Sequence, residues 1–326
     1  MLMENMISVI IPVYNGEFKI SKSLNSLVKQ NYKNFEVVIV NDGSTDNTLM
    51  KIKKYALKLN IKVVSKENEG VAIARNTGIQ MAQGSYVCFL DADDEFNDGF
   101  LDKMLDKAKL EKSDVVYCGY CEISNSISKQ VSCSFKTKNV LNNYIKGKTS
   151  IHTNGWLIKK KYIEDNQIYF RENTSWGEDF EFFCKVLFNT KKITFVRDYL
   201  TNYYVDHSPN QLSTFNLNKI DADYESIMYL ISTELGENKD IRNALLNYRL
   251  QALIVYRLNT SIQRNEKQSQ ILFYYEKYSD YFKKKSLFTN GLRSIKLAYH
   301  KRKLNNEIRK IQLIVKKKEG GDESGI

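Results

Sequence analysis

Apolar runs and segments of helical periodicity alternate along the first 120 residues of the chain. The runs are rich in β-branched residues and too short for helices, which is typical of buried strands, and they lie at residues 6–15, 35–40, 61–65, 85–91 and 114–121. Between them, apolar residues recur at helical spacing, as in the predicted helix over residues 70–82. This alternation predicts an α/β fold with a doubly wound, mostly parallel sheet and helices on both of its faces.

The strand pattern weakens over residues 124–204, and the chain turns helical from about residue 216. Apolar residues at helical spacing mark residues 220–235 and 241–262, and the pattern resumes near residue 270. We therefore expect an α/β domain over residues 1–215, a helical C-terminal region over residues 216–318 and a disordered tail over residues 319–326.

Excess positive charge is concentrated near the C-terminus. Residues 283–318 hold 13 lysine and arginine residues and one acid, a local net charge of +12, whereas the remaining 36 basic and 37 acidic residues give a net charge of −1. An apolar stripe at Leu304, Ile308, Ile311 and Val315 lies beside these charges, which predicts a basic amphipathic helix. A localised positive segment indicates an anionic partner.

We favour an anionic membrane surface as that partner, because each basic residue near such a surface contributes about 1 kcal/mol to binding. Nucleic acid is not expected, since no nucleic-acid-binding module is recognisable. A homo-oligomer formed through the C-terminal helices, with the charged face in water, is an alternative.

Cysteine usage and hydropathy suggest a compartment. The chain has five cysteines, an odd number, and no recognisable signal peptide. Together these features suggest that the cysteines are reduced thiols. No stretch approaches the ~18 apolar residues of a spanning helix. The expected location is the cytoplasm, peripheral on the inner face of the cell membrane.

Three acids, Asp91, Asp93 and Asp94, follow the apolar run of residues 85–90. Because strand side chains alternate between faces, Asp91 and Asp93 are expected to point to one side at the carboxyl end of a strand, where open α/β sheets bind ligands. Two carboxylates aimed together favour a hard divalent cation whose other ligands are substrate phosphates. An acidic turn that caps the next helix gives the same pattern.

The turn after the first strand lacks the G-x-G-x-x-G pattern, so a dehydrogenase is not expected. Tyr14 and Asn15 give this turn an aromatic surface beside a polar group, which suits a flat base. Asp42 ends the second strand, where an acid can accept hydrogen bonds from a nucleotide, and a plain Asp-Gly turn is the alternative. Arg75 can pair with a diphosphate or lie on a helix surface.

Four motifs in order carry a family resemblance. They are Pro-Val-Tyr-Asn at residues 12–15, Val-Asn-Asp-Gly-Ser-Thr-Asp at 40–46, Asn-Glu-Gly with Ala-Arg-Asn-Thr-Gly within 68–78, and Leu-Asp-Ala-Asp-Asp at 90–94. Together they closely resemble family-2 glycosyltransferases of the bacterial cell-surface polysaccharide type, which have the GT-A fold. The resemblance implies a nucleoside-diphosphate sugar donor, usually linked to UDP, and Mn²⁺ or Mg²⁺ as the cofactor.

The resemblance also implies roles for regions and single residues. Residues 1–110 are expected to bind the nucleotide sugar and residues 111–215 the acceptor. Asp91, Ala92 and Asp93 form the metal and donor motif, with Asp93 the firmer metal ligand. The other donor contacts that it implies are Pro12, Val13, Tyr14, Asn15, Asp42, Asn68, Gly70 and Arg75.

On the acceptor side, the segment Trp-Gly-Glu-Asp-Phe is similar to a family motif whose Asp, here Asp179, is the catalytic base. Crowding of Glu178 and Asp179 raises a carboxyl pKa, which suits one of them to proton abstraction, although acids also favour a helix start. Trp176 offers an aromatic face to a sugar ring.

Three further residues are candidates. His207 is similar to a histidine that touches the metal or the diphosphate in related enzymes, and a loop histidine without a ligand is the alternative. His152 and Trp156 can line an acceptor pocket, although Trp156 also fits a position in the core.

The resulting expectation is a metal-dependent, inverting hexosyl- or N-acetylhexosaminyltransferase. It moves a sugar from a nucleoside-diphosphate donor, such as a UDP-sugar, to a hydroxyl of a glycan or lipid-linked acceptor. A non-catalytic partner subunit with the same fold is an alternative. A sugar nucleotidyltransferase is a weaker one, because the glycine-rich loop expected after the first strand is absent.

Overall fold

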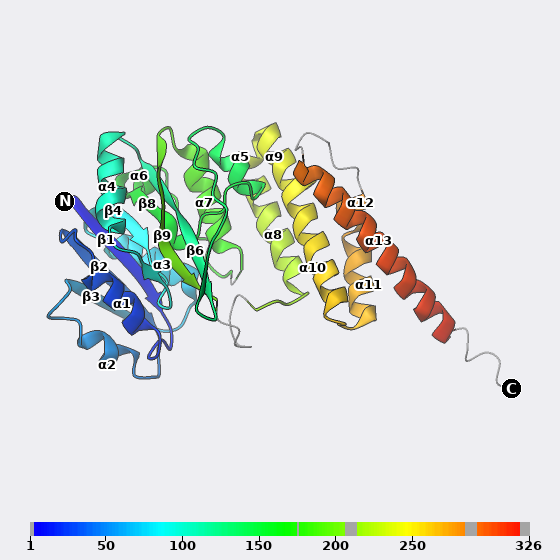
Figure 1. Ribbon diagram of the computed structural model, residues 1–326, viewed down its shortest axis with the longest axis horizontal. Coiled ribbons are helices and arrows are strands. Elements are labelled where there is room, and N and C mark those ends of the chain that lie inside the picture. Colours follow the sequence, from blue (N-terminus) through cyan, green and yellow to red (C-terminus); the bar gives the residue numbers. More distant parts are fainter. Residues whose placement is uncertain (1–2, 175, 206–213, 284–291, 320–326) are drawn as a thin grey trace. The chain divides into compact units, whose positions relative to one another are not determined.

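The computed structural model describes residues 3–174, 176–205, 214–283 and 292–319. The chain forms two compact units, Met1–Leu212 and Ser213–Ile326, each of which has its own set of elements (Figure 1).

One mixed sheet organises the first unit. Its strands, as far as the described residues show, are β1 (Met3–Val13), β2 (Phe35–Asp42), β3 (Ile61–Lys66), β4 (Gly84–Phe89), β5 (Glu95–Phe96), β6 (Val115–Ser124), β7 (Ile127–Gln130), β8 (Trp156–Lys159) and β9 (Ile193–Tyr204). They lie in the order β3-β2-β1-β4-β8-β6-β9-β5, and β7 pairs with β6. The strands β3, β2, β1 and β4 run parallel to one another, whereas β8 runs antiparallel to both β4 and β6. The predicted α/β fold with a mostly parallel sheet is confirmed.

Helices pack on both faces of this sheet. The helical elements of the first unit are α1 (Ile20–Val28), α2 (Thr48–Lys53), α3 (Val71–Met81), α4 (Phe100–Leu110), α5 (Val140–Ile145), the 3₁₀ turn η1 (Thr153–Gly155), α6 (Lys160–Asp165) and α7 (Glu178–Asn189).

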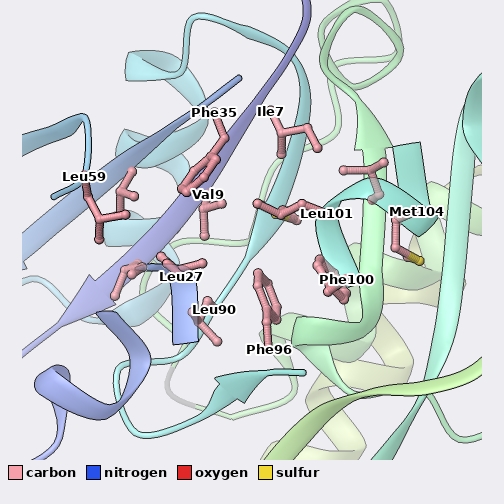
Figure 2. Packing of buried hydrophobic residues seen from close by; sticks show 14 of the residues in the cluster. Ile7, Val9, Leu27, Phe35, Leu59, Leu90, Phe96, Phe100, Leu101 and Met104 are labelled. Carbon is pink, nitrogen blue, oxygen red and sulfur yellow. The ribbon is translucent and has the colours of Figure 1, made fainter. Parts of the chain in front are cut away.

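Alternation along β1 explains the two layers. Ile7 and Val9 point to one face, where they join a buried cluster with Leu27 of α1 and Leu101 of α4 (Figure 2). Ile10 points to the other face and touches α3 so closely that a Cβ on Gly78 would lie 2.2 Å from its Cγ2. A glycine at this position therefore lets α3 approach β1 closely. The N-terminal end of α3 follows the carboxyl end of β3 after a short loop.

The acidic motif lies beyond the end of β4. That strand ends at Phe89, and the backbone N–H of Asp94 donates to the carbonyl of Asp91 over 3.0 Å, so residues 91–94 form a turn. The predicted strand end at Asp91 was wrong, and with it the argument that strand alternation orients Asp91 and Asp93. The apolar residues before the turn are buried on the sheet, but its acids are oriented by other contacts.

The second unit is helical. Its elements are α8 (Lys219–Ser232), η2 (Glu234–Glu237), α9 (Lys239–Ala244), the π-helical segment η3 (Leu245–Leu250), α10 (Gln251–Gln263), α11 (Gln268–Lys277), α12 (Ser279–Lys283) and α13 (Leu292–Glu319). The long helix α13 packs against α10 and α11. Among the described residues, no helix has both the length and the hydropathy that a bilayer-crossing segment requires.

Candidate functional site

Asp42 closes the loop that leads from β3 to α3. Its Oδ1 accepts hydrogen bonds from Lys66 Nζ (3.0 Å) and from the backbone N–H of Glu69 (3.1 Å), and its Oδ2 accepts from the N–H of Gly70 (2.8 Å). Gly70 has a φ of 93°, a conformation that side chains disfavour. The buried carboxylate therefore shapes the loop that presents exposed Asn68. Contact between Asp42 and a nucleotide stays a prediction.

The turn after β1 is held against the loop after β2. The backbone N–H of Asn15 donates to Ser44 Oγ over 2.9 Å, and Asn15 itself has a φ of 48°. Tyr14, next to it, exposes 54% of its surface and directly follows the carboxyl end of β1. Pro12 and Val13 are buried in β1, so any donor contact at Val13 is left to its backbone.

The turn over residues 91–94 is held in place by hydrogen bonds to Asn154 of η1. Asn154 accepts a hydrogen bond from the N–H of Asp91 (3.0 Å), and its amide donates to Asp94 Oδ2 (2.6 Å). The N–H of Tyr204 donates to the other oxygen of Asp94 (2.9 Å). Burial, reinforced by nearby Asp91, raises the pKa of Asp94 to about 8. The buried side chain of Asp94 thus connects the turn to η1 and to β9 through hydrogen bonds.

Asp93 is the accessible acid of this turn. Its side chain is 35% exposed, and Lys19 Nζ lies 3.4 Å from its Oδ2. Burial and the like charge of Asp91 raise the pKa of Asp93, and Lys19 opposes the shift. The Asp93 carboxylate therefore already attracts one cationic group, the ammonium of Lys19. Ala92, between the two acids, packs against the core.

Arg75 joins the two halves of the first unit. It is 5% exposed, its Nη2 donates to Asp91 Oδ1 (2.9 Å), and its Nη1 donates to Glu178 Oε1 (3.3 Å). Its guanidinium also lies 5.3 Å from the ring centre of Phe170. Burial alone lowers the pKa of Arg75, but Asp91, Glu178 and Asp179 outweigh it and raise the pKa. The predicted diphosphate ligand is thus a buried bridge between the acidic turn and the start of α7.

Glu178 and Asp179 open α7 and have different surroundings. Glu178 is buried, and desolvation together with the charge of Asp179 raises its pKa to about 7, against the pull of Arg75. Asp179 is partly exposed, its Oδ1 accepts from the N–H of Phe180 (2.7 Å), and its Oδ2 accepts from Thr153 Oγ1 (3.2 Å). The more accessible of the two acids is therefore Asp179, and its carboxylate is held from two directions.

The remaining candidates have different outcomes. Trp156 is fully buried and stacks on Phe183 with ring centres 4.7 Å apart, so its predicted place in an acceptor pocket was wrong. His152 stacks on Tyr203 and lies 3.9 Å from Asp94, beside the acidic turn. Trp176 is partly exposed just before α7. His207 lies outside the described residues.

The side chains around the turn fit a divalent cation. Within the described part of the chain, Asp91, Asp94 and His152 offer ligand atoms within 4.8 Å of one another, and carboxylate and imidazole ligands suit Mn²⁺. Both oxygens of Asp94 already accept N–H groups, so Asp91 and Asp93 are the freer carboxylates.

Sequence reasoning missed three residues of this arrangement: Lys19, Thr153 and Asn154. The side chains of Thr153 and Asn154 touch acids that lie 26 and 63 residues away along the chain. No local pattern marks such residues. The one available signal was their position next to His152 in a segment without strand periodicity.

The chain matches the family model described as Glycosyl transferase family 2 over residues 8–172, about half its length. It is 32% identical over 246 residues to the poly(ribitol-phosphate) beta-N-acetylglucosaminyltransferase TarS of Staphylococcus aureus strain Mu50, which covers 73% of this chain and 41% of TarS. It is 30% identical over 207 residues to TarP of S. aureus strain N315, covering 61% of this chain and 62% of TarP. The chain therefore spans less than two thirds of these curated relatives.

Solved structures share the fold. The crystal structure of S. aureus TarS residues 1–349 in complex with UDP-GlcNAc matches with a TM-score of 0.69 and 23% identity, over 97% of this chain and 92% of that one. A mannosyltransferase of Pyrobaculum calidifontis in complex with GDP-Man and Mn²⁺ matches with a TM-score of 0.57 and 16% identity, over 95% of this chain and 84% of that one. At these identities the likeness establishes the fold, a GT-A domain followed by a helical region, as predicted.

Proposed function

Since the chain belongs to glycosyl transferase family 2, we propose that it transfers an N-acetylhexosaminyl group from a UDP-sugar, UDP-GlcNAc first among them, to a hydroxyl of a cell-surface glycan or lipid-linked acceptor. The observation that carries the proposal is the bridge made by Arg75. It binds Asp91 of the donor motif on one side and Glu178 of the acceptor motif on the other. The guanidinium of Arg75 thereby connects the proposed donor motif to the proposed acceptor motif through two ion pairs.

The nucleotide is proposed to lie at the carboxyl ends of β1 and β2. Exposed Tyr14 offers a ring to the base, and Asp42 with the loop of Asn68 and Gly70 forms the adjoining wall. This position agrees with the general rule that open α/β sheets bind ligands outside the carboxyl ends of their strands.

The cofactor is proposed to be Mn²⁺ or Mg²⁺ held by Asp93 and Asp91. When bound, such an ion neutralises charge on the departing nucleoside diphosphate, a contribution of several kcal/mol. Asp93 is partly exposed, its pKa is raised by burial and by Asp91, and it already attracts the ammonium group of Lys19, which supports it as a cation ligand. His207 stays a predicted further ligand.

The base is proposed to be Asp179. The acceptor hydroxyl oxygen attacks the anomeric carbon, the bond from that carbon to the β-phosphate oxygen breaks, and its electron pair leaves with UDP. Asp179 takes the hydroxyl proton. A single displacement inverts the configuration at the anomeric carbon. Asp179 is the better base of the pair, because Glu178 is buried against Arg75 and its pKa of about 7 leaves it partly protonated.

The acceptor class is proposed from the relatives. TarS and TarP are poly(ribitol-phosphate) N-acetylglucosaminyltransferases, so a polymer that carries polyol or sugar hydroxyls is the first acceptor to test here. Trp176, partly exposed before α7, is the proposed platform for it. We also propose a cytoplasmic location, because all five cysteines are free thiols.

The test is turnover of nucleotide sugars by the full chain. UDP-GlcNAc with Mn²⁺ and a poly(ribitol-phosphate) acceptor should release UDP and give a product of inverted anomeric configuration, visible by NMR. UDP-glucose and GDP-mannose serve as comparison donors. Binding of UDP-GlcNAc without turnover on any of several acceptors would favour a non-catalytic partner subunit, and failure of every nucleotide sugar to raise the melting temperature would reject the donor assignment.

A further inference from the structure

The outward face of α13 has a composition of its own. Between residues 294 and 315, the exposed side chains recur every three or four positions, which places them on one face of the helix. They are Ile295, Lys296, Tyr299, Arg302, Lys303, Asn306, Arg309, Lys310, Leu313 and Ile314. Five are basic, four are apolar or aromatic, and none is acidic.

The apolar stripe predicted from the sequence lies on the opposite side. Leu304, Ile308 and Ile311 are buried, as is Leu297 about two turns before Leu304, where α13 packs against α10 and α11. Those residues hold the helix in the second unit and are not free to enter a bilayer. Any partner must therefore use the outward face.

The arrangement along this face is ordered. Apolar residues lie at its two ends, Ile295 with Tyr299 and Leu313 with Ile314, and the basic side chains lie mainly between them. At 1.5 Å per residue, the face is about 30 Å long. Lys310 forms an ion pair on this face, with its Nζ 2.9 Å from half-buried Glu307, and within the described ranges no ion pair is seen for the other four basic side chains.

We infer that this face of α13 docks on a membrane surface that contains anionic lipid. Basic side chains are attracted to the anionic headgroups, and exposed isoleucine, leucine and tyrosine side chains can enter the boundary between headgroups and acyl chains. The rest of the chain carries almost no net charge, so the attraction is localised at this end of the sequence.

Two other occupants fit the face less well. A second copy of the chain would oppose five basic side chains to five others without an exposed acid to pair with them. A soluble polyanion would be attracted by the charges but would leave the four apolar side chains without a contact. The combination of both kinds of residue favours a lipid surface.

The experiment is sedimentation of the full chain with vesicles. Vesicles of phosphatidylglycerol and phosphatidylcholine should pellet the protein, and pure phosphatidylcholine vesicles should not. Replacement of Arg302, Lys303 and Arg309 by Gln should lower the partition coefficient about 10²-fold, from roughly 1 kcal/mol for each charge. The matched control replaces three exposed basic residues elsewhere in the second unit, Lys239, Arg242 and Lys267, by Gln. It removes the same charge and should keep nearly all of the binding.

A second variant separates lipid from a polyanion. Ile295→Asn with Leu313→Asn should weaken vesicle binding several-fold and leave binding to heparin, a soluble polyanion, unchanged. Equal loss in the control and in the α13 variant, or no effect of the two apolar substitutions, would overturn the inference in favour of non-specific charge attraction. A dimer in light scattering that the Gln variant abolishes would overturn it in favour of self-association. The test needs no glycosyl donor, so its result is independent of the proposed enzyme activity.

Discussion

Thr153 donates a hydrogen bond from its Oγ1 to Asp179 Oδ2 over 3.2 Å, and Thr153 itself is buried. The contact joins the turn beneath the acidic motif to the first turn of α7. Together with the N–H of Phe180 on Oδ1, it occupies one position on each oxygen of the proposed base and fixes the plane of the carboxylate.

Thr153→Val should lower kcat by up to about 10²-fold, because a displaced base transfers the acceptor proton poorly, and should leave the KM for UDP-GlcNAc nearly unchanged. Thr153→Ser keeps the hydroxyl and should restore most of kcat. Steady-state kinetics of the three proteins checks this. An equal loss in the serine and valine variants would assign Thr153 a packing role only.

Asp179→Asn should lower kcat by about 10² to 10⁴-fold if Asp179 is the general base, while binding of UDP-GlcNAc, measured by calorimetry, stays close to wild type. The amide cannot accept the proton but keeps the size of the side chain. Turnover near the wild-type rate would remove Asp179 from the mechanism and make Glu178, with its pKa of about 7, the next candidate.

Arg75→Met should destabilise the protein by about 3–5 kcal/mol, because it leaves the carboxylates of Asp91 and Glu178 without their shared cation. Urea unfolding measures the change. The matched control is Lys103→Met, which breaks an exposed ion pair with Asp198 and should cost no more than about 1 kcal/mol. Similar effects of both substitutions would mean that the buried bridge contributes little.

Ionisation of Glu178 should lower the free energy of unfolding as the pH rises. Its pKa of about 7 in the folded protein lies above its ordinary value of 4.5, so the folded state binds the proton more tightly than the unfolded state. The resulting stabilisation is complete below about pH 4.5 and is lost as the pH rises through 7.

Glu178→Gln removes this titration. Between pH 5 and 8, in EDTA, the wild-type free energy of unfolding should fall relative to that of the variant by on the order of 1 kcal/mol. Glu111→Gln, at an exposed acid, serves as the control and should follow the wild type. A variant curve parallel to the wild-type curve would contradict the raised pKa.

The sequence could predict the strands and the acidic motif because their signals are local. The continuous apolar run of β1, buried from Met6 to Val13, and the apolar run before Asp91 both consist of residues a few positions apart. The supports of the motif could not be predicted in this way. Asn154 reaches Asp91 only after β8 enters the sheet beside β4, and that antiparallel insertion depends on pairing across some 70 residues.

The apolar periodicity of α13 also did not reveal what its buried face packs against. The stripe at Leu304, Ile308 and Ile311 predicted an amphipathic helix, which the structure contains, but periodicity tells only that one face is buried. That face packs in the second unit instead of meeting a membrane. Trp156 shows the same limit, since an aromatic residue suits a core and a sugar platform equally well until its neighbours are known.

Lys19 is expected to compete with the metal. Its ammonium lies 3.4 Å from Asp93 Oδ2 and acts as a counter-ion to the carboxylate proposed to bind Mn²⁺. Lys19→Gln removes this competitor and should tighten Mn²⁺ binding to the donor-free protein by up to about fivefold, the effect of a partly exposed ion pair of up to 1 kcal/mol.

Electron paramagnetic resonance of free Mn²⁺ measures the affinity directly and requires no turnover. Lys103→Gln, which breaks the Asp198 pair, is the control and should bind Mn²⁺ as the wild type does. Asp93→Asn should abolish the gain when it is combined with Lys19→Gln, because both effects act through one carboxylate. Weaker Mn²⁺ binding by the Lys19 variant would show that this lysine supports the ion and does not displace it, and unchanged binding by the Asp93 variant would place the metal on other ligands.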